Sequence, residues 1–179
     1  MMKPNNWFGG DRTFEQQMTG LDWLKDVCHG RTILDFGCAE GLISIEMLRH
    51  GATHVHGIEL VLERVKAARV NARGYASLFE TGDANAWKPT KRYGVVLALA
   101  ILHKLTDPSA VARRLARAAD HAVVLRLPPR GAVVIDPRSK NVPHDLGAVL
   151  VDEGFVLEPK VSGNYGPLEE WIGLYWKAT

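Results

Sequence analysis

Short apolar runs alternate along this chain with segments in which apolar residues recur every three or four positions. The first pattern predicts buried strands, and the second predicts helices that pack one face on a core. The predicted strands cover residues 32–36, 53–58, 75–81, 93–100, 122–127, 155–161 and 168–177. The predicted helices cover residues 13–28, 41–49, 61–72, 108–119 and 143–153. Strands that alternate with helices of this length indicate βαβ units and therefore a parallel sheet.

The two ends of the chain depart from this alternation. Residues 1–12 form an arm with aromatic and glycine residues, and a capping box at Thr13 opens the first helix. The arm has two interpretations, a tail packed on the surface or a lid over a ligand. Near the other end, two strands follow each other across a turn at residues 162–167 without a helix. We predict one domain over 1–179, divided into the arm (1–12), a leading helix (13–30) and a sheet core (31–177).

Composition narrows the class of protein. With 179 residues and 46% hydrophobic content, the chain can bury the core of one domain. A net charge of +2 neither requires nor excludes a nucleic-acid partner. Cys28 and Cys38 lack the spacing of a disulfide framework or a zinc site, and His54 and His56 lack a third ligand, so we expect no metal. Without a long apolar run or an apolar leader, we expect a cytoplasmic protein with no membrane partner.

The most informative stretch is Ile-Leu-Asp-Phe-Gly-Cys-Ala-Glu-Gly at residues 33–41. It predicts a buried strand that enters a tight glycine turn and then a helix, whose N-terminus can receive a polar ligand. Asp35 argues against a phosphate at this turn. Ala39 and Leu42 stand where the dinucleotide-binding pattern requires glycines, and the Lys-Ser/Thr pair of a P-loop is absent.

Two more acidic residues follow the next predicted strands. Glu59 ends the second strand, and Asp83 follows Gly82 after the third. In an open α/β sheet, ligands bind beyond the carboxyl ends of the central strands. The three features therefore predict one site at that edge.

The glycine turn, the acid after the next strand and the following Gly-Asp-Ala together resemble the cofactor loops of class I S-adenosylmethionine-dependent methyltransferases. The resemblance covers residues 31–177. It implies an α/β fold with a seven-stranded, mostly parallel Rossmann-like sheet in the order 3-2-1-4-5-7-6, strand seven antiparallel and helices on both faces. It also implies S-adenosylmethionine as the cofactor and S-adenosylhomocysteine as its product.

The resemblance implies a role for each cofactor residue. The turn would approach the methionine part of the cofactor, and Glu59 would accept hydrogen bonds from both ribose hydroxyls. Asp83 would accept a hydrogen bond from the adenine amino group, while the Ala84 N–H would face a ring nitrogen. Ala39 departs from the glycine usual in the family, which narrows the backbone conformations allowed there. The implied cofactor-binding residues are Asp35, Gly37, Cys38, Ala39, Gly41, Glu59, Leu60, Asp83, Ala84 and Ala100.

Methyl transfer mainly requires an aligned acceptor and, for some acceptors, a general base. His103, just after the fourth strand, is the candidate base because its ordinary pKa lies near neutrality; a packing histidine is the alternative. The motif Asn/Asp-Pro-Pro-Tyr/Phe of enzymes that methylate base amino groups is absent. The Lys-Asp-Lys-Glu tetrad of ribose 2′-O enzymes is not recognisable either, so a small-molecule acceptor is favoured.

Other functions stay open at this point. The roof over the acceptor should come from residues 1–12, 102–106 and 129–142. Four basic residues in or beside it keep an RNA acceptor open: Arg126, Arg130, Arg138 and Lys140. A non-catalytic S-adenosylmethionine-binding or scaffold protein and an NAD(P)-dependent oxidoreductase are the alternatives from other classes. The acceptor atom and the oligomeric state do not follow from the sequence.

Overall fold

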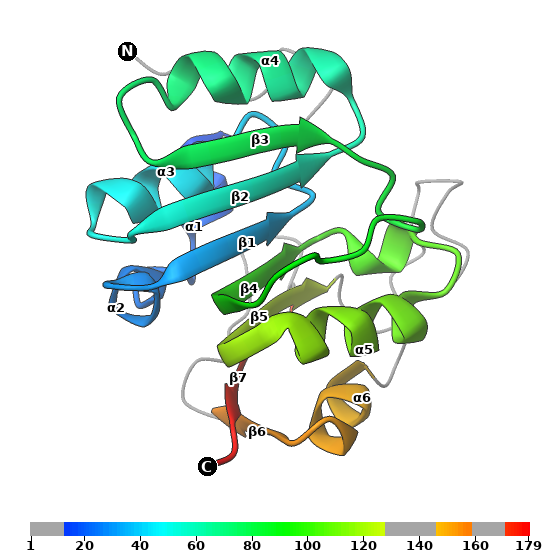
Figure 1. The fold of residues 1–179 in the computed structure, drawn as a ribbon. Helices are drawn as coiled ribbons and strands as arrows, with labels where there is room; N and C mark the ends of the chain where they lie inside the picture. Colours follow the sequence, from blue (N-terminus) through cyan, green and yellow to red (C-terminus); the bar gives the residue numbers. More distant parts are fainter. Residues whose placement is uncertain (1–12, 128–145, 159–170) are drawn as a thin grey trace.

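A computed structural model describes residues 13–127, 146–158 and 171–179 of the chain. One seven-stranded sheet has the order β3-β2-β1-β4-β5-β7-β6 (Figure 1). Strands β1 to β5 are parallel, whereas β7 runs antiparallel to both β5 and β6. The predicted fold class and strand order are therefore confirmed. The strands are β1 (Thr32–Phe36), β2 (His54–Glu59), β3 (Ser77–Thr81), β4 (Tyr93–Leu99), β5 (Ala119–Leu127), β6 (Phe155–Glu158) and β7 (Trp171–Lys177).

Helices cover both faces of the sheet. Buried side chains of α2, α3 and α4 form a core on one face, and those of α5 and α6 form a second core on the other (Figure 1). None of the helices in the described segments is both long and apolar enough to cross a membrane. The helices are α1 (Phe14–Met18), α2 (Leu24–Cys28), α3 (Leu42–Arg49), α4 (Leu62–Asn71), the 3₁₀ helix η2 (Leu102–Lys104), α5 (Pro108–Ala118) and α6 (Leu146–Asp152).

The prediction of a single leading helix is wrong, because the segment forms the two short helices α1 and α2. The capping box is present: Thr13 Oγ1 accepts from the Gln16 N–H, and Gln16 Oε1 accepts from the Thr13 N–H at 2.8 Å. Gly20 then takes a φ of +74°, a left-handed conformation that ends a helix. The break lets Leu21 and Leu24 both reach the core, where each is fully buried.

Residues 82–92 connect β3 to β4 without a helix and run from one end of the sheet to the other (Figure 1). Trp87 fixes this loop, because its ring lies 5.6 Å from the ring of His56 and its Nε1 donates to Glu80 Oε1. His56 also contacts the Tyr93 hydroxyl at 2.5 Å, so His56 packs inside the fold. Across the described segments, no three His, Cys, Asp or Glu residues lie close enough to hold a metal.

Candidate functional site

Three loops meet at the carboxyl edge of the sheet, joined by backbone hydrogen bonds. The N–H groups of Gly37 and Cys38, in the turn after β1, donate to the Ile58 carbonyl at 2.8 and 3.0 Å. The N–H of Gly82, in the loop after β3, donates to the Glu59 carbonyl at 2.9 Å. The end of β2 therefore holds both neighbouring loops, and the features singled out in the sequence form one site.

The Glu59 side chain is held in place by two backbone donors. Its Oε2 accepts from the Ala39 N–H at 3.1 Å, and its Oε1 accepts from the Val61 N–H at 3.0 Å. The residue is only 8% exposed. A carboxylate has about four acceptor positions, so each oxygen retains capacity for a hydroxyl donor. Glu59 thus combines a fixed orientation with the capacity to bind a diol.

The turn after β1 has the backbone conformations that its glycines suggest. Gly37 and Gly41 have φ values of +85° and +73°. A Cβ atom at Gly37 would lie 3.0 Å from Ile101, so the turn also packs closely against the segment after β4. Ala39 adopts a φ of +49°, a left-handed conformation that costs a residue with a Cβ atom about 1 kcal/mol. This conformation accounts for the glycine usual at the position in the family.

Asp35 is buried at the end of β1 and bonds to the helix that follows. It is 4% exposed, and the Ser44 hydroxyl in α3 donates to its Oδ2 at 2.5 Å. Burial raises the pKa of Asp35 to about 6, the bond from Ser44 opposes this shift, and the nearby charge of Glu59 adds to it. Sequence reasoning missed Ser44, although a serine inside an apolar helical run is a signal for a buried polar partner.

We expect Asp35 to make the protein less stable as the pH rises from about 4 to about 6. Its folded pKa of about 6 lies above the ordinary 3.8, so the folded state binds the proton more tightly and the free energy of unfolding falls across this window. Asp35→Asn keeps an acceptor for Ser44 but does not titrate. Its free energy of unfolding relative to the wild type should rise by about 2–3 kcal/mol between pH 4 and pH 6.5.

Urea unfolding at four pH values measures this difference. Asp26→Asn, at an exposed position in α2, is the control and should follow the wild-type profile. Parallel profiles for wild type and Asp35→Asn would contradict the raised pKa.

The loop that carries Asp83 is fixed by residues from distant parts of the chain. Asp83 is exposed, and its Oδ1 accepts from the backbone and side-chain nitrogens of Asn85 at 2.9 and 3.1 Å. Asn85 Oδ1 accepts from the Thr106 N–H at 2.9 Å, and Arg114 Nη2 donates to the Ala84 carbonyl at the same distance. The second Asp83 oxygen accepts no hydrogen bond from the described residues, so it retains its capacity for a donor.

Apolar groups border these acids. Leu60, directly after Glu59, is 62% exposed, which leaves an apolar surface next to the carboxylate. Ala100 has a φ of +59° and donates its N–H to the Arg126 carbonyl, so the chain turns sharply after β4. Leu99 and Ile101 are half-buried beside it. Cys38 is buried, and burial raises the pKa of its thiol well above the ordinary value.

The acceptor side of the site is described only in part. His103 lies in η2 and is 6% exposed. The expectation that Arg126 could receive a substrate anion is wrong: it is 2% exposed and donates to the carbonyls of Gln17 and Thr19, at the end of α1. The arm 1–12 and the roof segment 129–142, with the other three basic residues proposed for it, lie outside the described residues.

Comparison with known proteins gives consistent matches. A family model for a methyltransferase domain matches residues 21–147. The ubiquinone biosynthesis O-methyltransferase of Aeromonas salmonicida is 32% identical over 128 residues, which are 68% of this chain and 50% of that protein. The ribosomal protein L11 methyltransferase of Dechloromonas aromatica is 38% identical over 81 residues, which are 44% of this chain and 26% of that protein. The chain thus spans 50% of the length of the first relative and 26% of the length of the second.

A solved structure extends the match in three dimensions. Magnesium protoporphyrin IX methyltransferase from Synechocystis PCC 6803, crystallised with bound S-adenosylmethionine, superposes with a TM-score of 0.73 at 22% identity. The superposition covers 90% of this chain and 79% of that one. The family model matches most of the length of this chain, and the sheet has the strand order that the motifs implied. This chain therefore belongs to the class I S-adenosylmethionine-dependent methyltransferase family.

Proposed function

We propose that this chain binds S-adenosylmethionine at the carboxyl edge of its sheet and transfers the methyl group to a small-molecule acceptor. The observation that carries the proposal is the Glu59 carboxylate, oriented by the N–H groups of Ala39 and Val61 between the glycine turn and the Asp83 loop. A carboxylate fixed in this way is suited to a pair of vicinal hydroxyls such as those of a ribose.

The residues around Glu59 fit the rest of the cofactor. Asp83 would accept a hydrogen bond from the adenine amino group, and the Ala84 N–H would face a ring nitrogen. The exposed Leu60 would pack on the face of the adenine ring. The turn at 37–41 would lie against the methionine part, with Asp35 and Glu59 providing negative charge near a cationic ligand. When bound, S-adenosylmethionine supplies a methyl group already activated on a sulfonium sulfur.

The acceptor would lie beyond β4. The half-buried side chains of Leu99, Ala100 and Ile101 offer an apolar surface there, which suits an acceptor with an apolar or aromatic body. The 32% identity to an O-methyltransferase of ubiquinone biosynthesis supports a hydroxyl as the methylated group. We propose His103, in η2, as the base that removes the hydroxyl proton; because it is buried, an acceptor must reach the small part of the residue that is exposed.

Calorimetric titration tests the cofactor first. We expect binding of S-adenosylmethionine and S-adenosylhomocysteine and none of NAD. Binding of NAD alone would favour an oxidoreductase. Methyl transfer from radiolabelled S-adenosylmethionine is then measured with a small-metabolite extract, with RNA and without acceptor. Radiolabel in the metabolite fraction supports the proposal. Radiolabel in the RNA would mean that the acceptor is RNA and not a small molecule. Cofactor binding without radiolabel in any fraction would indicate a non-catalytic protein.

A further inference from the structure

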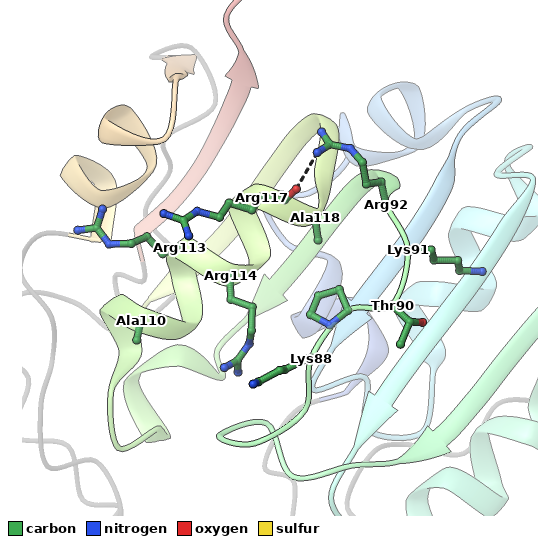
Figure 2. Close-up of a pocket in the computed structure, with 10 residues that line it drawn as sticks. Lys88, Thr90, Lys91, Arg92, Ala110, Arg113, Arg114, Arg117 and Ala118 are labelled. Atoms are coloured by element: carbon green, nitrogen blue, oxygen red, sulfur yellow. Dashed lines mark hydrogen bonds between the residues drawn. The ribbon is translucent and has the colours of Figure 1, made fainter.

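A groove of about 680 Å³ lies between the β3–β4 loop and α5 (Figure 2). None of the residues proposed for the cofactor lines it. Six of its ten lining residues are basic, three from the loop and three from the helix: Lys88, Lys91, Arg92, Arg113, Arg114 and Arg117. This concentration of positive charge is the feature that needs an explanation.

The groove extends along the direction of the strands. The loop runs from the carboxyl end of β3 to the amino end of β4, and α5 runs back from the carboxyl edge to the start of β5. The 11 residues of α5 span about 16 Å. At one end Arg114 reaches the Asp83 loop through the Ala84 carbonyl, and at the other Arg92 donates to the Arg117 carbonyl (Figure 2).

The positive charge of the groove is only partly balanced. Arg113 and Arg117 both pair with Glu153, Arg113 also reaches Asp152, and Arg92 pairs with Asp120. Lys88, Lys91 and Arg114 form no ion pair with the described residues. Six cations against three carboxylates leave an excess of three positive charges, larger than the net +2 of the whole chain.

One of these cations also has an unused donor. Arg114 extends from α5 toward the loop (Figure 2), and its Nη2 is held by the Ala84 and Asn85 carbonyls. Its Nε is buried and has no hydrogen-bond partner among the residues that the structure describes. The groove therefore has an excess of positive charge over the carboxylates that pair with it, and an anionic partner would balance this excess.

The lining distinguishes between classes of anionic partner. Its apolar members, Pro89, Ala110 and Ala118, are small, whereas protein interfaces depend on large apolar anchors. Among the residues that the structure describes, no aromatic side chain lines the groove, so this lining lacks the stacking surfaces that bind single-stranded bases. Arginine and lysine together are the usual contacts to the phosphates of a duplex. We propose that this groove binds the phosphate backbone of a double-stranded nucleic acid.

The length of the groove suits this partner. Its six cations are spread along a helix of about 16 Å, so they could contact more than one phosphate of a duplex backbone. Backbone contacts carry no sequence information, so binding should be independent of sequence and strongly salt-dependent. The inference does not depend on the identity of the methyl acceptor, because the groove adjoins the Asp83 loop through Arg114 but none of the proposed cofactor residues lines it.

Fluorescence anisotropy with a labelled RNA duplex and a DNA duplex of the same length tests the groove. Lys88→Glu/Lys91→Glu reverses two exposed charges in the loop, and Lys25→Glu/Lys66→Glu makes the same charge change on α2 and α4 at the other face of the sheet. We expect the groove variant to bind at least about tenfold more weakly in low salt, with the slope of log affinity against log salt reduced by about two; the control should change less than about threefold.

Three results would overturn the inference. Equal losses in both variants would mean that overall charge governs binding, and wild-type protein that binds neither duplex would leave the groove without this partner. Displacement of the duplex by polyglutamate at matched charge would indicate an acidic protein instead. Comparison of the two duplexes identifies which nucleic acid is preferred. Titration with S-adenosylmethionine should give the same affinity in both variants and the wild type, so a failure here is distinguishable from failure of the proposed function.

Discussion

Glu59→Ala should lower the affinity for S-adenosylmethionine by a hundredfold or more. The substitution would remove the two charge-assisted hydrogen bonds that we propose between Glu59 and the ribose, each with a contribution of about 1.5–3 kcal/mol, and 1.4 kcal/mol corresponds to a factor of ten. It also releases the N–H groups of Ala39 and Val61, which donate to the Glu59 carboxylate in the structure. Isothermal titration calorimetry measures the change directly.

Two further variants make this result interpretable. Glu59→Gln retains an acceptor for the backbone but loses the charge, so its affinity should lie between those of the wild type and Glu59→Ala. Glu63→Ala removes an exposed carboxylate in the first turn of α4, four positions later, and should bind as the wild type does. An unchanged affinity for Glu59→Ala, with the fold intact by circular dichroism, would show that Glu59 does not bind the ribose.

Gly57→Ala should reduce the free energy of unfolding by about 2–3 kcal/mol, because overpacking a dense core is costly. A Cβ atom at Gly57 in β2 would lie 2.3 Å from Phe79 Cδ1 and 2.8 Å from Cys38 Sγ. Phe79 is 2% exposed and Cys38 7%, so neither has room to move. Urea unfolding monitored by tryptophan fluorescence gives the difference.

A double-mutant cycle with Phe79→Leu tests the mechanism. The smaller side chain makes room for the added methyl group, so Gly57→Ala should cost at least about 1 kcal/mol less in the Phe79→Leu background. Additive effects of the two substitutions would mean that the clash with Phe79 is not the cause.

The sequence was sufficient for the sheet and for the residues at its carboxyl edge. The alternation of apolar runs with helical segments predicts a parallel sheet, whereas the order of its strands was implied by the resemblance of the motifs to the family. The Asp83 loop and Glu59 could be located because each directly follows a predicted strand. The break between α1 and α2 was missed because Met18, Leu21 and Leu24 keep helical spacing across Gly20, so periodicity alone does not reveal it.

Contacts between distant residues could not be read from the sequence. Arg114 and the Ala84 carbonyl that it holds are 30 positions apart, and no local pattern links them. Arg126 was considered as a contact for a substrate anion because it lies in or beside the predicted roof over the acceptor. A charged residue within the apolar run of β5 can instead be buried when backbone carbonyls accept its hydrogen bonds, as those of α1 do.

The bond between Arg126 and α1 has a consequence for the order in which the protein assembles during synthesis. The Gln17 carbonyl and the Arg126 guanidinium are separated by 109 positions, so α1 leaves the ribosome long before its buried partner exists. Until β5 has been made and paired with β4, α1 has no cation to dock on, and closing so long a loop carries an entropic cost. Although α1 also packs against α3, its anchor at Arg126 therefore forms only after β5 is in place, late in synthesis.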